Sequence, residues 1–328
     1  MRRRELLTFL SGAAIVWPIA ARAQQQAGGM RRIGVLMHTA ADDPESQARL
    51  AAFQEALQHS GWEVGRNVVI DVRWSTADPQ RFTDAQSLVA LNPDVLLAGV
   101  GATIPPLMRA TSTVPIVFAQ AIDPVGAGYV ESLARPGGNA TGFIQFEYNL
   151  AGKWLELLKE FAPKIERVAV LREGGTAGVG QWAIIQAVAQ TLSVEPKPIA
   201  LTSAHEIERA VSAFASTPNG GLIVVVSAAG LTHRQLILDL AARYKLPTIY
   251  PYRVFVSSGG LIAYGADIAG LYRRAAAYVD RILKGEKPSD LPVQAPTKYE
   301  LVINSKTAKS LGLNIPGTLL ARADEVIE

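Results

Sequence analysis

The stretch Arg32–Met37 (RIGVLM) decides the fold, because the same design returns at Arg167–Leu171 (RVAVL). Both runs are short and almost entirely apolar, which is typical of a parallel strand that is buried on both faces of a sheet. The first run is followed by a segment with Leu50, Phe53 and Leu57 at helical spacing, and Gly61 ends that segment. The sequence therefore predicts two α/β units, each of which opens with a buried strand.

Strands and helices alternate throughout both halves of the chain, which change over near Gly142–Tyr148. In the first half we expect strands at 32–37, 67–74, 95–98 and 115–119, with helices at 45–60, 79–91, 104–110 and 125–133. In the second half we expect strands at 167–171, 195–200, 221–226, 248–250 and 260–264, with helices at 150–161, 181–192, 205–216, 234–244 and 269–283. Strict alternation indicates right-handed crossovers and parallel sheets.

The C-terminal segment breaks this alternation with a strand at 298–303 and a short helix at 305–311, which indicates extra crossings between the two units. The predicted fold class is α/β, with two doubly wound parallel-sheet lobes joined by a multi-strand hinge. We expect the N-terminal lobe to contain 31–143 plus about 268–297, and the C-terminal lobe 144–267 plus about 298–328. A hinge between two such lobes predicts a closing cleft.

Residues 1–23 have the three parts of an export signal. Three consecutive arginines precede a mildly apolar stretch, and Ala21-Arg22-Ala23 forms a small-x-small cleavage site. The arginines followed by Glu5-Leu6-Leu7 are similar to a twin-arginine signal, and an anchoring N-terminal helix is the alternative. The chain has no cysteine for lipid attachment, so we expect a protein that is exported to the periplasm and soluble there.

The charge balance argues against a nucleic-acid partner. The chain has 32 basic and 29 acidic residues, of which residues 1–23 contain four and one, so the rest has 28 of each. The absence of cysteine also excludes disulfides, thiolate metal sites and cysteine nucleophiles.

The sequence contains no complete catalytic or cofactor motif. The segment Gly99–Thr103 opens like a dinucleotide-binding loop, but the third glycine of that motif is Ile104 here. Gly175 and Gly180 have the separation of a phosphate loop, but Gln181 stands where that loop needs lysine. Ser227 lacks the flanking glycines of a nucleophile elbow, and the four histidines lack metal-ligand spacing. We therefore expect no catalytic residues, no metal and no cofactor.

Candidate binding residues follow from the rule that ligands of parallel sheets bind beyond the carboxyl ends of the strands. Asp123 and Asp267 could each cap a helix or meet an amino group of a ligand. Arg172 and Arg253 could bind a ligand carboxylate or form surface ion pairs. Thr176 lies in a glycine-rich loop at a helix N-terminus that could hold a carboxylate. The complete set of expected ligand-binding residues is Thr39, Ala102, Thr103, Asp123, Arg172, Thr176, Ser227, Tyr250, Arg253 and Asp267.

Several long segments resemble a family of bacterial ABC-transporter substrate-binding proteins. The most specific is Asp123–Gly142 (DPVGAGYVESLARPGGNATG). The others are Gly152–Pro163 (GKWLELLKEFAP), Pro218–Ile223 (PNGGLI), Ala276–Pro292 (AAYVDRILKGEKPSDLP), Thr297–Leu313 (TKYELVINSKTAKSLGL) and Ala321–Glu328 (ARADEVIE). The resemblance implies a type I periplasmic binding fold, with three hinge strands and a ligand clamped between the lobes. Some relatives bind tryptophan or similar amino acids.

The resemblance carries over to the cleft positions Thr39, Ala102, Thr103, Asp123, Ser227, Tyr250 and Asp267. It does not carry over at Leu171–Gly174, where many relatives read roughly FNP, so their solute does not transfer to this chain. We expect a periplasmic protein, not an enzyme, that binds a small carboxylate-bearing solute such as an amino acid or aromatic acid. Its partners would be that solute and the membrane permease of an ABC transporter, and it would act as a monomer. The alternatives are an exported α/β hydrolase-like enzyme and a ligand-sensing regulator of the same fold.

Overall fold

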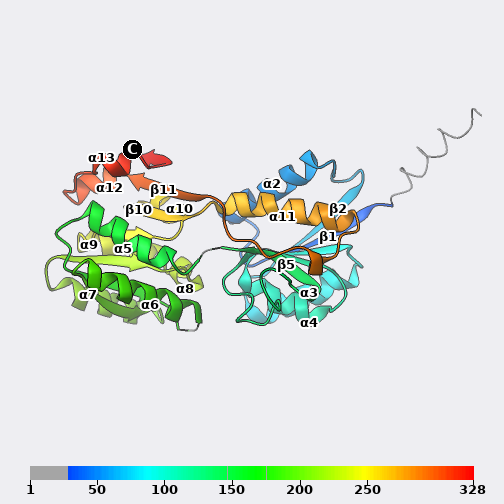
Figure 1. Ribbon diagram of the computed structural model, residues 1–328, viewed down its shortest axis with the longest axis horizontal. Helices are drawn as coiled ribbons and strands as arrows, with labels where there is room; N and C mark the ends of the chain where they lie inside the picture. Colours follow the sequence, from blue (N-terminus) through cyan, green and yellow to red (C-terminus); the bar gives the residue numbers. More distant parts are fainter. Residues whose placement is uncertain (1–28, 146, 175) are drawn as a thin grey trace, which may run out of the picture.

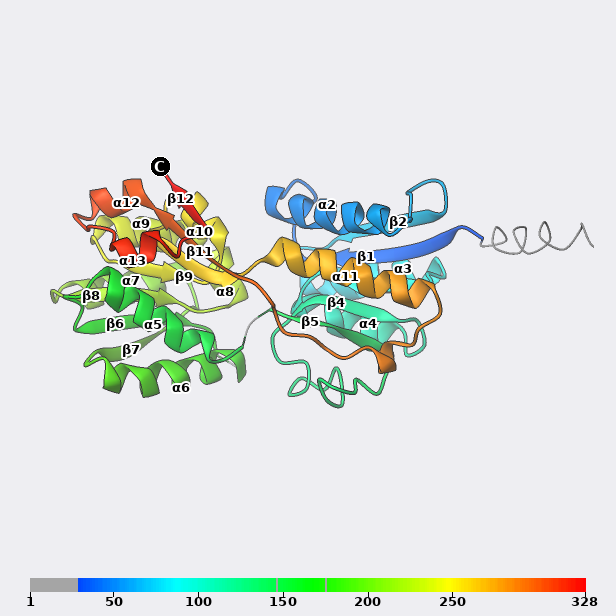
Figure 2. The same ribbon diagram turned by 45° about the horizontal axis from the view of Figure 1, so that its top comes forward.

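The computed structural model describes residues 29–145, 147–174 and 176–328, so the predicted export signal lies outside the described residues. The described chain forms two lobes that lie side by side along the long axis of the molecule (Figure 1 and Figure 2). Each lobe is built on one β-sheet, five-stranded in the N-terminal lobe and seven-stranded in the C-terminal lobe. The predicted α/β class is confirmed.

The sheet of the N-terminal lobe is parallel throughout, in the order β2-β1-β3-β4-β5. Helices α2 and α11 cover one face, and α3 and α4 cover the other. The strands are β1 (Arg31–Met37), β2 (Val68–Trp74), β3 (Val95–Ala98), β4 (Ile116–Ala121) and β5 (Ala140–Ile144). The helices are α2 (Pro44–His59), α3 (Asp78–Ala90), η1 (Gly101–Thr103), α4 (Ile104–Ala110), α11 (Ile268–Leu283) and η2 (Pro288–Asp290).

The sheet of the C-terminal lobe has the order β12-β11-β10-β9-β8-β6-β7. Strands β7, β6, β8, β9 and β10 are parallel, whereas β11 runs antiparallel to β10 because the chain enters it from the other lobe. The strands are β6 (Arg167–Arg172), β7 (Glu195–Ala200), β8 (Gly220–Val224), β9 (Thr248–Tyr250), β10 (Ile262–Ala266), β11 (Tyr299–Asn304) and β12 (Glu325–Ile327).

Helices cover both faces of this second sheet. Helices α5 and α6 enclose one core with the buried Trp154, whose indole donates to the Tyr264 carbonyl over 2.7 Å. Helices α7 and α9 enclose the other core. The helices are α5 (Leu150–Phe161), α6 (Thr176–Thr191), α7 (Ala204–Ala215), α8 (Ala228–Thr232), α9 (Arg234–Arg243), α10 (Arg253–Ser257), α12 (Ser305–Ser310) and α13 (Gly317–Leu320).

The chain passes between the lobes three times, after β5, between β10 and α11, and before β11. The crossings lie side by side, because Gln294 exchanges backbone hydrogen bonds with β5 and the Asp267 amide donates to the Lys298 carbonyl. Helix α11 is fixed to the N-terminal lobe by the Tyr272 hydroxyl, which donates to the Gly99 carbonyl over 2.9 Å.

One predicted helix is wrong. Residues 125–133 form a turn and an irregular segment, because the glycines within the run favour tight turning and Gly128 adopts φ +72. The Asp123 carboxylate accepts a hydrogen bond from the Gly126 amide and begins the turn. The strand that follows, β5, was not expected.

Candidate functional site

A cavity of about 430 Å³ lies between the lobes and has walls from both. Its lining surface is mostly apolar and includes several polar side chains. The N-terminal lobe contributes His38, Arg49, Val100, Gly101, Ala102, Pro105, Gln120, Ile122, Asp123, Ala127 and Tyr129, the first crossing contributes Gln145, and the C-terminal lobe contributes Gly174, Val226, Ser227, Leu231 and Tyr252. A cavity of this size suits a small ligand with an apolar part, since small-molecule sites span roughly 300–1,000 Å³.

In the wall of the N-terminal lobe and directly beside it lie buried polar atoms that have no hydrogen-bond partner among the described residues. These are Nδ1 of His38, Oγ1 of Thr39 and Nε2 of Gln120. His38 and Thr39 follow β1 directly, and Gln120, at 4% exposure, lies in β4, which β3 separates from β1 in the sheet. Because unpaired buried polar atoms are costly, such a group at a cavity wall is well placed to bind a polar ligand.

His38 is held neutral in this wall. Burial, reinforced by the positive charges of Arg49 and Arg81 and opposed by Asp43, lowers the pKa of His38 to about 4. The imidazole therefore offers one donor and one acceptor near neutral pH, with no positive charge.

The wall of the C-terminal lobe begins where β8 ends. Ser227 is 5% exposed, and its hydroxyl accepts a hydrogen bond from the Gly230 amide and so caps α8. Tyr252 faces the cavity from the segment before α10, and its hydroxyl donates to Oε1 of Gln145 over 3.4 Å. This contact joins the wall of the C-terminal lobe to the first crossing, and burial raises the pKa of Tyr252 well above its usual value.

Arg49 reaches the cavity from helix α2. Its side chain is only 11% exposed, and its nearest charged partner is Glu45, at 3.8 Å between Nη2 and Oε2. The strand-end rule missed this residue because it lies on a helix. A signal was present, because Arg49 lies three residues after Ser46 and four before Phe53, and both of these residues are on the buried face of α2.

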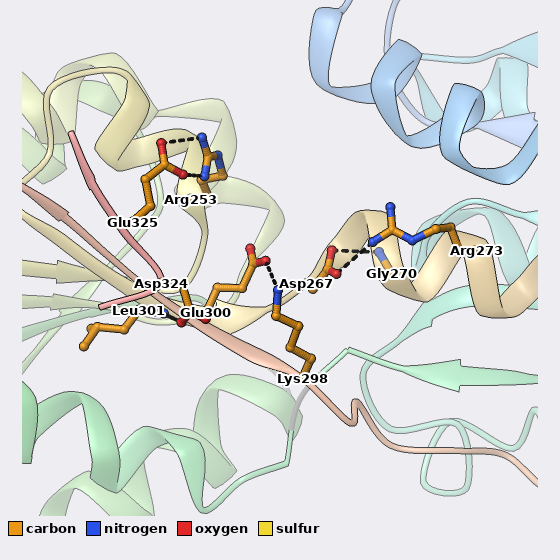
Figure 3. Close-up of polar contacts among 9 residues, drawn as sticks. All are labelled: Arg253, Asp267, Gly270, Arg273, Lys298, Glu300, Leu301, Asp324 and Glu325. Atoms are coloured by element: carbon orange, nitrogen blue, oxygen red, sulfur yellow. Dashed lines mark hydrogen bonds and ion pairs between the residues drawn. The ribbon is translucent and has the colours of Figure 1, made fainter. Parts of the chain in front are cut away.

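A second space of about 260 Å³ lies beside the crossings, and Arg49 and Tyr252 line it as well as the first cavity. Figure 3 shows the polar contacts in this region. The Asp267 carboxylate caps α11 through the Gly270 amide and pairs with Arg273 at 2.9 Å. Lys298, which immediately precedes strand β11, forms an ion pair at 3.0 Å with Glu300 on that strand.

The structure brings Ala102, Asp123 and Ser227 of the expected binding residues to the cavity, and Thr39 lies next to its wall beside His38. Thr176 begins α6, and its side chain lies outside the described residues.

The other expected residues make their contacts away from the cavity wall. The Thr103 hydroxyl is used inside turn η1, where it donates to the Val100 carbonyl over 2.7 Å. Tyr250 is 1% exposed and stacks on Phe255 in the core of the C-terminal lobe. Arg172 does not line the cavity, and its Nη1 donates weakly to the Glu173 carbonyl at 3.5 Å.

The last two of the expected residues, Arg253 and Asp267, lie at the second space. Arg253 forms a two-point ion pair with Glu325, as Figure 3 shows, and Asp267 caps α11 as described above. The sequence left open helix capping for Asp267 and a surface ion pair for Arg253, and these contacts favour those roles.

In the part of the chain that the structure describes, no group of three or more metal-ligating side chains comes together. Over the same part, none of the helices has the length and apolar character that crossing a bilayer requires.

Comparison with known proteins agrees with this geometry. The chain is 27% identical over 282 residues to a tyrosine-binding protein of Clostridioides difficile, which covers 83% of this chain and 79% of that protein. An ABC domain from Streptococcus pneumoniae, solved in complex with L-Trp, has a TM-score of 0.82 at 26% identity and covers 91% of this chain and 100% of that chain. A conserved domain protein from Vibrio cholerae has a TM-score of 0.82 at 27% identity and covers 90% and 99%.

The architecture is that of type I periplasmic binding proteins, as the sequence resemblance predicted. Residues 34–327 match the family described as ABC transporter substrate binding protein, and this match spans both lobes and all three crossings. The chain belongs to the ABC transporter substrate-binding protein family.

Proposed function

We propose that this protein binds a small carboxylate-bearing solute, an amino acid or aromatic acid, in the cavity between its lobes and delivers it to the permease of an ABC importer. The observation that carries the proposal is the cavity itself, whose walls come from both lobes and include buried polar atoms without partners among the described residues. The polar strand ends suit the charged part of such a solute, and the apolar lining suits its side chain.

The names of the relatives support the same class of solute. One is a tyrosine-binding protein, and another was solved with L-Trp. Tyr129 and Tyr252 line the cavity here and offer faces for an aromatic ring. The contacts that we propose for the solute are Thr39, Ala102, Asp123 and Ser227 from the expected set, with His38, Gln120, Tyr129 and Tyr252 in addition.

The lobes are proposed to move as units, 31–143 with about 268–297 against 144–267 with about 298–328. A solute that contacts both walls stabilises the closed arrangement because only that arrangement supplies both sets of contacts. The permease would then recognise the closed form.

The remaining features of the proposal follow from the sequence. The signal at residues 1–23 would direct the chain through the twin-arginine route to the periplasm, where it would act as a soluble monomer. The protein would not bind nucleic acid and would release its solute chemically unchanged. Neither an exported hydrolase nor a regulator is favoured by a specific contact.

The test is thermal unfolding of the purified protein lacking residues 1–23, with each candidate acid in turn. We expect a bound acid to raise the melting temperature in proportion to the logarithm of its concentration, and the recovered acid to be intact by mass spectrometry. Native mass spectrometry of the protein as purified identifies any solute that it retains. A chemically altered acid, or a retained metal ion, nucleotide or sugar, would overturn the proposal.

A further inference from the structure

Arg49 is a nearly buried cation that makes no hydrogen bond with any of the described residues. Its contact with Glu45 is an ion pair at 3.8 Å, which is too long for a hydrogen bond, and Glu45 is itself 46% exposed. A guanidinium has five N–H donors in a planar fork, and withdrawing them from water without partners is unfavourable.

Two other sheltered arginines, Arg81 and Arg274, are satisfied by hydrogen bonds. The Arg81 side chain is 14% exposed, pairs with Asp78 and donates to the Ser75 and Thr76 carbonyls. Arg274 is also partly buried and donates to the Ala295 carbonyl and to the Gln294 side chain. Arg49, at the cavity, has no comparable hydrogen bonds to the described residues.

Arg49 and Tyr252 both line the main cavity and the second space, and they come from opposite lobes. An anion held at Arg49 would therefore lie where the two walls meet, beside the crossings. A contact at this point is sensitive to closure, because it brings the N-terminal lobe and the C-terminal lobe to the same group of the solute.

From these observations we infer that Arg49 binds the carboxylate of the solute and thereby selects acids over their neutral derivatives. The inference rests on the proposed function and names the residue that sets its specificity. A carboxylate matches the guanidinium fork with two parallel hydrogen bonds. The cavity lining holds one arginine, Arg49, and one carboxylate, Asp123, and this balance of charge favours a singly charged group over a doubly charged phosphate.

The experiment compares amino acids with their amides, which keep the side chain and the amino group but lose the negative charge. Isothermal titration calorimetry measures the dissociation constants of L-tryptophan and L-tryptophanamide. The acids and amides of tyrosine, phenylalanine and leucine are measured in the same way. Each pair is measured on the wild-type protein, on Arg49→Gln and on Arg49→Lys. We expect Arg49→Gln to weaken binding of the acid by roughly 10-fold to 100-fold and binding of the amide by less than about 3-fold. Arg49→Lys should lie between, because an ammonium keeps the charge without the fork.

The matched control is Arg243→Gln, which removes an arginine from helix α9 where it pairs with Glu208 at 3.0 Å on the surface. This variant should keep the wild-type ratio of acid to amide affinity. The melting temperature of unliganded Arg49→Gln separates binding from a structural role. Because no hydrogen bond is lost, it should equal or exceed that of the wild type.

The outcomes distinguish the inference from the function on which it rests. If the wild type prefers an acid over its amide and Arg49→Gln keeps that preference, the role of Arg49 is overturned and the proposed function stands. If the wild type binds none of the acids, or binds acid and amide equally, the proposed function fails and the inference fails with it.

Discussion

His38 makes the stability of the protein depend on pH. Its pKa is about 4 in the folded chain and about 6.5 in an unfolded one, so between these values the unfolded state binds more protons. The contribution is fully present above pH 6.5 and is lost as the pH falls toward 4. We expect the free energy of unfolding to lose about 2 kcal/mol from this residue between pH 7 and pH 4.5.

Urea unfolding at those two pH values, on the wild type and on His38→Gln, measures this contribution. The variant should lose less stability on acidification, because its side chain does not ionise. His59→Gln, at the exposed end of α2, is the control and should follow the wild type. An equal loss in His38→Gln and the wild type would mean that His38 does not titrate in this way.

We expect Gln120 to lower the stability of the unliganded protein and to raise its affinity for the solute. Its Nε2 atom is buried without a partner among the described residues, so Gln120→Leu removes an unsatisfied donor. The melting temperature of the unliganded variant should stay the same or rise, while its affinity for the solute should fall roughly 10-fold because one hydrogen bond is lost. Thermal unfolding and titration calorimetry check the two halves separately, and unchanged affinity would remove Gln120 from the site.

The residues of the site were only partly predictable from sequence. The strand-end rule found Ala102, Asp123 and Ser227, because parallel strands fix where their loops meet. It selected Tyr250, which is buried in the core, and not Tyr252, which lines the cavity. The rule identifies a strand end, but it does not show which of the residues there faces the cleft. It could not find Arg49, which approaches from the middle of a helix and depends on the packing of α2.

At the scale of elements, strand β5 depends on one glycine. Gly142 adopts φ +149, and a Cβ atom at this position would lie 2.0 Å from the Phe118 carbonyl oxygen of β4. We expect Gly142→Ala to reduce the free energy of unfolding by at least about 3 kcal/mol, because both the backbone angle and the pairing of β5 are disturbed. Urea unfolding measures this loss.

Gly138→Ala is the matched control for that substitution. A Cβ atom at Gly138 would meet nothing within 4 Å, so this variant should unfold within about 0.5 kcal/mol of the wild type. Equal stability of the two alanine variants would show that β5 tolerates a side chain at position 142.

The predictable elements were those with a strong local pattern. Runs such as Arg32–Met37 and Gly221–Val226 are apolar enough to specify buried strands, and the helices between them have clear spacing. Strand β5 was missed because Ala140–Ile144 contains glycine and threonine and owes its pairing to β4 and to the third crossing. Residues 125–133 have helical spacing, but their glycines turn the chain.

At the scale of the whole molecule, binding should be visible as compaction. If the solute bridges both walls of the cavity, the lobes approach each other and the radius of gyration decreases. Small-angle X-ray scattering on the wild type, without solute and at saturation, measures this change. Arg49→Gln should require a higher solute concentration to reach the same compact state. An unchanged radius at saturation would argue against closure.

The position of α11 has a consequence for biosynthesis. Leu271, Tyr272 and Val279 complete the core of the first lobe, yet they are encoded after five of the seven strands of the second. While the ribosome is still translating the middle of the message, the side of the first sheet beneath α2 lacks its final cover. The N-terminal lobe is thus synthesised first but cannot complete its core until α11 has been made. Until residue 283 has emerged from the ribosome, the nascent chain exposes apolar surface that chaperones can bind.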